Sequence, residues 1–125
     1  NRVVASRCSS AHAEILALSL AQARQGSHDL GASGLPACEL VTSAEPCMMC
    51  LGAVLWSGAR RLVCAARGDD VVALGFDEGP RPANWIDELQ ARGISVATDL
   101  LRDEACAILR SYHKAGGPIY NARQG

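Results

Sequence analysis

Residues 38–65 read CELVTSAEPCMMCLGAVLWSGARRLVCA. Two short runs within this segment, 38–43 and 61–65, have the apolar and β-branched composition typical of strands. An apolar helix is predicted between them, over 47–57, because Pro46 suits the start of a helix and Gly58 suits its end. The segment therefore predicts a strand, a helix and a second strand in succession.

The sequence on either side continues this alternation. Before the segment, Ser10 is predicted to cap a helix over 11–25, and 26–36 has the composition of a loop. The predicted elements after it are a loop over 68–82 with one helical turn at 69–74, a helix over 85–92, a strand over 94–98 and a final helix over 103–113. Alternating strands and helices predict a mostly parallel sheet covered by helices, which is the α/β class.

Length and composition predict a single domain over residues 1–125. The 125 residues are 49% hydrophobic, which excludes a disordered chain, and two domains would each be too small to hold a core. The longest apolar run, 47–56, is far shorter than the about 20 residues that a membrane helix needs, so we expect a soluble protein with no membrane partner. The net charge of −1 provides no bulk positive field, which argues against a nucleic-acid partner.

The cysteines indicate a reducing compartment. An even number of six would permit three disulfides. However, we find no signal-peptide pattern, and the chain is long enough to build a core without cross-links, so reduced thiols in a cytoplasmic protein are expected. Only Cys47 and Cys50 are close in sequence, and this pair needs an explanation of its own.

Cys47 and Cys50 provide two ligands of a predicted zinc site. Cysteines three positions apart at the start of a helix project to the same side, and the helix N-terminus stabilises their thiolates. Structural zinc needs four protein ligands, and the remaining cysteines are single and scattered. His12 would add a third ligand and leave one position for water, which is the arrangement of catalytic zinc.

The segment 12–14 provides this histidine together with a carboxylate, Glu14. In a helix interior, residues two apart point in nearly opposite directions, so His12 and Glu14 can share a site only where the helix begins. Zinc with two thiolates and a neutral imidazole carries no net charge and acidifies water only moderately. We therefore assign Glu14 as the base that takes a proton from the water and passes it to the substrate in a hydrolysis.

The motifs H-x-E at 12–14 and P-C-x-x-C at 46–50 resemble those of the cytidine-deaminase-like zinc deaminase superfamily. The resemblance implies a three-layer α/β/α fold with a mixed, mostly parallel sheet and one Zn²⁺ per subunit. It also implies that the Ala13 backbone and the start of the cysteine helix, with Pro46, touch the substrate. The family domain begins with a helix and two strands that this sequence lacks, so we expect a sheet edge to be uncovered.

Two further segments indicate the substrate. Residues 45–50 resemble the branch of guanine deaminases and tRNA adenosine deaminases, and 75–78 (GFDE) resembles guanine deaminases. In that resemblance a carboxylate faces the purine, where it accepts hydrogen bonds from the ring N–H and amino groups of guanine. Glu78 is our first choice for this role and Asp77 the second, and an ordinary solvated turn is the alternative.

The same resemblance assigns three other residues to the pocket. Trp56 matches an aromatic residue near the base, with core packing as its alternative, and Asn1 matches an asparagine that hydrogen-bonds the substrate. Tyr120 belongs to the tail 118–121, which resembles segments that close over the site, sometimes from a neighbouring subunit. The implied partners are a small nucleobase and a second copy of the chain.

Guanine, converted to xanthine and ammonia, is the predicted substrate, but other functions remain open. Cytosine or an aminotriazine would use the same catalytic residues in a different pocket. A tRNA adenosine deaminase needs a basic surface, which the charge balance and a single lysine, Lys114, do not provide. A non-catalytic alternative is structural zinc or a thioredoxin-like redox pair at Cys47 and Cys50, although either would leave the 12–14 motif unexplained.

Overall fold

The computed structural model describes residues 1–123. Among them, no helix combines the length and apolar character that a membrane crossing requires. The elements in chain order are α1 (Val3–Ser6), α2 (Ala13–Gln25), β1 (Glu39–Ala44), α3 (Met48–Ser57), β2 (Arg61–Ala66), α4 (Gly68–Val72), α5 (Trp85–Gln90), β3 (Ser95–Ala97) and α6 (Arg102–Lys114).

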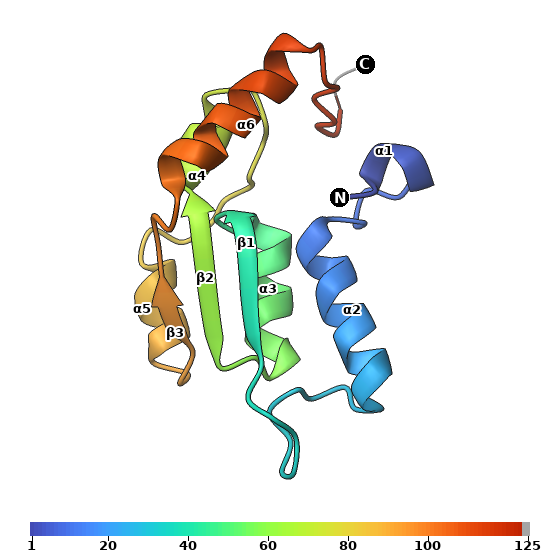
Figure 1. Cartoon of the computed structure of the whole chain (residues 1–125), viewed down its shortest axis with the longest axis vertical. Helices are drawn as coiled ribbons and strands as arrows, with labels where there is room; N and C mark the ends of the chain where they lie inside the picture. The colour runs from blue at the N-terminus through green and yellow to red at the C-terminus, as the bar shows by residue number, and fades with distance from the viewer. Residues whose placement is uncertain (124–125) are drawn as a thin grey trace.

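The strands form one sheet in the order β1-β2-β3, as Figure 1 shows. Both pairings are parallel, with Leu62 of β2 opposite Leu40 of β1 and Val96 of β3. The predicted α/β class is therefore confirmed. The sheet was expected to be mixed, yet every strand pair within 1–123 is parallel, and β1 is an edge strand.

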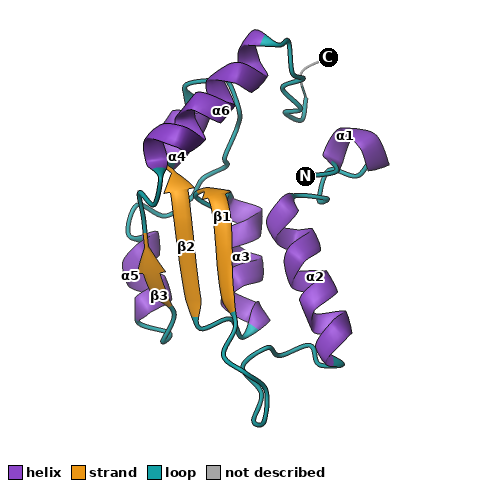
Figure 2. Cartoon of the chain, viewed as in Figure 1, coloured by secondary structure: helices purple, strands orange, loops and turns teal. Residues whose placement is uncertain are grey.

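The main core lies on the face of the sheet that α3 and α5 cover, with α2 beside α3 (Figures 1 and 2). Its buried members are Leu18, Leu30, Leu40, Leu51, Val54, Leu62, Cys64, Trp85, Leu89 and Ile94. On the opposite face, Val41 of the edge strand is exposed, because no described element covers that part of β1. Alternation of side chains along a strand explains this difference between Leu40 and Val41.

The predicted helix over 47–57 is confirmed as α3, and its end depends on a glycine. Gly58 has a φ of 80°, the left-handed conformation common just after a helix. A side chain there would collide with Asp29 and Gly31, because the Leu30 N–H donates a 2.8 Å hydrogen bond to the Ser57 carbonyl. Gly58 thus ends α3 and brings the preceding loop against it.

The start of α2 differs from the prediction. The helix begins at Ala13, and its N-cap is His12, with an extended backbone, instead of Ser10. The Ser10 hydroxyl lies 3.3 Å from the Cys8 sulfur, so it is occupied outside the helix. The other predicted elements agree with the structure to within two residues, whereas α1 was missed because four residues are too few to show a helical period.

Candidate metal centre

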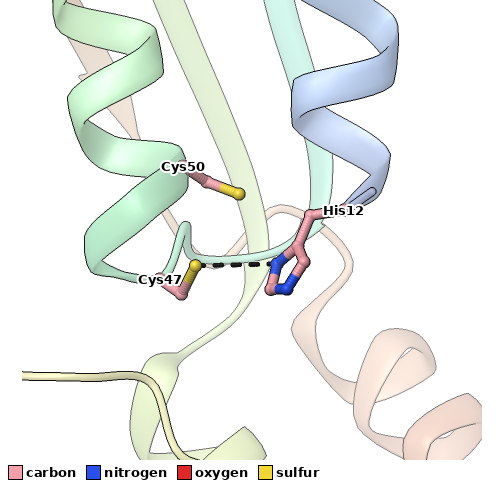
Figure 3. A group of neighbouring side chains, drawn as sticks. All are labelled: His12, Cys47 and Cys50. Atoms are coloured by element: carbon pink, nitrogen blue, oxygen red, sulfur yellow. Dashed lines mark hydrogen bonds between the residues drawn. The ribbon is translucent and has the colours of Figure 1, made fainter. Parts of the chain in front are cut away.

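Three ligand residues predicted from sequence spacing meet at one point, as Figure 3 shows. His12 precedes α2, Cys47 precedes α3, and Cys50 lies in the first turn of α3. The donor atoms of the three side chains all lie within 4.8 Å of one another, and His12 Nδ1 is 3.6 Å from Cys47 Sγ. Both cysteines are buried, with Cys50 completely so. The group is therefore compact and largely shielded from water.

The supersecondary structure explains why these side chains converge. Helices α2 and α3 lie side by side, and their N-termini point to the same end of the sheet (Figure 1). That end is the carboxyl edge of β1, from which the chain turns through Pro46 into α3. Helix N-termini carry partial positive charge, so this end of the molecule favours anionic ligands such as thiolates.

The geometry fits zinc. Zinc–sulfur and zinc–nitrogen bonds of about 2.3 and 2.0 Å at a tetrahedral angle place the two donor atoms about 3.6 Å apart. The separation between His12 Nδ1 and Cys47 Sγ matches this value. Within residues 1–123, no fourth histidine, cysteine or carboxylate joins the group. Three protein ligands leave one position open, which is the catalytic arrangement and not the structural one.

The two thiols differ in acidity. The pKa of Cys47 is lowered to about 5, first by a hydrogen bond from the Cys50 side chain and also by the nearby His12. The pKa of Cys50 is raised by the same hydrogen bond, by burial and by the negative charge of Glu14. The raised pKa of Cys50 means that binding of zinc by both sulfurs is accompanied by release of the Cys50 proton.

The metal ligands border a large cavity. It has a volume of about 1180 Å³, and His12 and Cys47 are among its lining residues. Acidic residues line it as well: Glu14, Glu45, Asp77 and Glu78. Other predicted site residues on its wall are Asn1, Ala13 and Tyr120.

Residues from the first and last described segments of the chain meet on the wall of this cavity. The Asn1 side-chain amide donates a 2.6 Å hydrogen bond to the Tyr120 hydroxyl. The Tyr120 ring meets the His12 ring edge to face at a centroid distance of 6.2 Å, and the Phe76 ring at 5.1 Å. Residues from the two ends of the sequence therefore pack around a zinc ligand.

Asn121 attaches the tail to the loop that carries Glu78. Its amide nitrogen donates to the Gly75 carbonyl at 2.7 Å, and its amide oxygen accepts from the Asp77 N–H at 2.9 Å. The sequence does not predict a role for Asn121, because a carboxamide that binds backbone groups elsewhere in the chain leaves no local pattern.

The side chains of Asp77 and Glu78 have different surroundings. Asp77 accepts a hydrogen bond from the Gly79 N–H at 2.9 Å, as in an ordinary Asx turn. The carboxyl of Glu78 is partly buried, and burial is the main reason that its pKa is raised to about 7, with the nearby Cys47 charge adding to it. The turn interpretation therefore suits Asp77, although both residues line the cavity.

Two predicted pocket residues lie elsewhere. Trp56 was expected either near the base or in the core, but it is 86% exposed and does not line the cavity, since it lies on the side of α3 that faces away from the sheet. Pro46 was expected to touch the substrate, but it is buried and absent from the cavity wall. Its carbonyl instead accepts a hydrogen bond from Arg81 at 3.1 Å.

Comparison with known proteins agrees with this geometry. Residues 1–66 match the family described as the cytidine and deoxycytidylate deaminase zinc-binding region. A solved structure of a guanine deaminase from Nitrosomonas europaea is 73% identical, with a TM-score of 0.90 over 91% of this chain and 63% of that one. Another solved structure, in complex with 2,6-diaminopurine, is also 73% identical, with a TM-score of 0.92 over 98% of this chain and 65% of that one.

A curated relative is more distant. Guanine deaminase from Bacillus subtilis (strain 168) is 41% identical over 78 residues, which are 62% of this chain and 47% of that protein. The chain thus spans about half of this relative and less than two thirds of the Nitrosomonas europaea protein.

Proposed function

Because this chain belongs to the cytidine and deoxycytidylate deaminase zinc-binding family, we propose that it acts as a hydrolytic guanine deaminase that forms xanthine and ammonia. The observation that carries the proposal is the placement of Glu14 and Glu78 on one cavity wall with His12 and Cys47. The 73% identity with a guanine deaminase over 91% of the chain supports the choice of substrate.

The proposed reaction requires zinc ligands, a proton carrier and contacts to the base. His12, Cys47 and Cys50 would hold zinc, which when bound supplies a Lewis acid that lowers the pKa of water. Glu14, in the first turn of α2, accepts a proton from the attacking water. It passes this proton to the ring nitrogen next to the attacked carbon. It then takes the remaining proton of the former water from the hydroxyl on that carbon and delivers it to the leaving amine. The Ala13 backbone lies beside it on the cavity wall and contacts the base.

Asn1 and Glu78 provide substrate recognition in this proposal. Guanine presents N–H donors that a carboxylate accepts, whereas a carboxamide both donates and accepts. Two solved relatives, at 73% and 72% identity, contain 8-azaguanine and carry a substituted asparagine or a substituted glutamate. Those two positions are as far apart along that chain as Asn1 and Glu78 are here.

An ammonia-release panel tests the proposal. Guanine, cytosine, adenine, adenosine and tRNA are each supplied to the purified protein with and without a chelator. We expect release from guanine alone and its loss after chelation. Activity confined to tRNA would overturn the choice of substrate, and no release from any compound would favour a non-catalytic zinc module.

The substitution Glu78→Gln is expected to lower kcat/KM for guanine by about 10- to 100-fold. A hydrogen bond to a charged group contributes about 1.5–3 kcal/mol to binding. In the variant this bond is lost, because the NH₂ group of glutamine is itself a donor and would face an N–H donor of guanine. Steady-state kinetics with guanine measure the effect. Asp77→Asn is the matched control, because asparagine also closes an Asx turn and should leave the kinetics nearly unchanged. Equal kinetics for Glu78→Gln and wild type would return Glu78 to the solvated-turn interpretation.

We also propose that residues 1–125 belong to one deaminase domain, and that the protein forms a homodimer in the cytoplasm. Trp56 on α3 and Leu20 on α2 are 86% and 70% exposed, and large apolar side chains on neighbouring helices are typical of a covered surface. Sedimentation of the zinc-loaded protein at the mass of a single chain would contradict the dimer.

A further inference from the structure

A nearly buried ion pair, Arg81 with Glu45, lies next to the turn that carries Cys47, and Glu45 itself lines the cavity. Arg81 Nη2 is 2.8 Å from Glu45 Oε2, and the two side chains are only 16% and 10% exposed. Glu45 ends the turn from β1 and directly precedes Pro46, whereas Arg81 lies in the loop that follows Glu78. The pair therefore joins two loops, one that carries a zinc ligand and one that carries the proposed substrate carboxylate.

Each partner makes additional contacts that hold it in place. Arg81 Nη1 donates to the Pro46 carbonyl at 3.1 Å, and its guanidinium lies over the Trp85 ring at 5.0 Å. The carboxylate of Glu45 also accepts the Gly68 N–H at 2.9 Å. A Cβ at Gly68 would lie 2.5 Å from Arg81 Nη2, so the guanidinium packs closely against the backbone at the start of α4.

A second contact fastens the same loop to α3. The Met48 N–H, at the N-terminus of α3, donates to the Glu78 carbonyl at 3.0 Å. A Cβ at Gly79 would lie 3.1 Å from the Met48 Cβ, so the backbone of the loop packs closely on this turn. The loop thus contacts the zinc-binding turn at two places, with Glu78 at one of them and Arg81 at the other.

We propose that Arg81, held by Glu45, is a positioning residue that sets the distance between the Glu78 carboxylate and the zinc ligands. The inference rests on the proposed function, since it assumes that Glu78 binds the substrate. Replacing a buried ion pair with apolar residues is often neutral for stability, so geometry is the better reason for placing one here. Arginine suits this role because its planar guanidinium group can donate to two acceptors while it stacks on an aromatic ring. The ammonium group of lysine cannot make both kinds of contact at once.

The test uses Arg81→Met, Arg81→Lys and a matched control, Arg61→Met, in the zinc-loaded protein. Arg61 forms a comparable pair with Glu39 at 3.1 Å, but the side chains are 55% and 42% exposed and line no part of the cavity. We expect Arg81→Met to raise KM for guanine about tenfold or more, with one zinc per chain and kcat within about threefold of wild type. Arg81→Lys should be intermediate, and Arg61→Met should match wild type.

Hydrogen exchange provides a readout that needs no turnover. In Arg81→Met, exchange should rise about tenfold or more in a peptide spanning 76–82, while β2 keeps its protection. Both the KM change and the local exchange change are required by the proposal. An unchanged KM, an unchanged exchange rate in 76–82, or a uniform rise along the chain would overturn it. If the wild type releases no ammonia from guanine, the proposed function fails, whereas the exchange comparison still decides whether Arg81 holds the loop.

Discussion

The substitution Glu14→Gln is expected to lower kcat for guanine deamination by about 10³-fold or more while one zinc per chain is retained. Glutamine has nearly the same shape as glutamate but cannot accept and return a proton. The proposed reaction needs Glu14 at each of its four proton transfers, so the loss affects the chemical step and not substrate binding. KM should therefore change much less than kcat.

Kinetics and metal analysis of the same preparation measure this effect. Glu104→Gln is a matched control, because Glu104 also lies in the first turn of a helix, α6, and does not line the cavity. Any general effect of removing a carboxylate from a helix N-terminus appears in both variants. Retention of zinc with turnover within about tenfold of wild type would rule out Glu14 as the proton carrier.

The substitution Cys50→Ser is expected to abolish zinc binding and to lower the free energy of unfolding by several kcal/mol. Structural zinc sites in small peptides bind with apparent free energies of about 10–16 kcal/mol, and metal that binds only the folded state stabilises it. Cys50 is completely buried beside Cys47 and near Glu14. Without zinc, Cys47 and Glu14 place neighbouring negative charges at the N-termini of α2 and α3 and lack the balancing charge of the metal.

Zinc content and the midpoint of denaturant unfolding measure both effects. Cys64→Ala is the control, because Cys64 is as fully buried as Cys50 but lies in β2 outside the ligand group. Cys64→Ala should keep zinc, and its free energy of unfolding should fall by only about 1 kcal/mol, as expected for a small core truncation. Treatment of the wild type with a chelator should reproduce the behaviour of Cys50→Ser. A zinc-free variant as stable as the wild type would show that the metal has no part in holding the fold.

The alternation of short strands and helices could be predicted from local patterns. The segment 38–65 contains two apolar runs and a helix bounded by Pro46 and Gly58, and these signals depend only on neighbours in the sequence. The N-cap of α2 could not be predicted in this way. Ser10 has the chemistry of a cap, but a contact with Cys8 occupies its hydroxyl, and the cap is the zinc ligand His12.

The surroundings of the site were less predictable than its ligands. Trp56 resembled a pocket residue by its place in the sequence, yet the rotation of α3 against the sheet directs it to solvent. Sequence position along a helix does not say which face meets the core when all faces are apolar, as in α3. The hydrophobic pattern therefore indicated a helix but left the direction of each side chain open.

The identity of each zinc ligand could be predicted, because each motif places its residues within one turn of a helix start and the chemistry of thiolate and imidazole follows from residue type alone. The meeting of His12 with Cys47, which belong to separate motifs, was decided by the tertiary structure. The contacts of Tyr120 with Asn1, of Asn121 with Gly75 and of Arg81 with Glu45 were decided by the tertiary structure. Each of these contacts joins residues far apart along the chain. Such residues meet only after the whole chain has packed, so no local pattern records them.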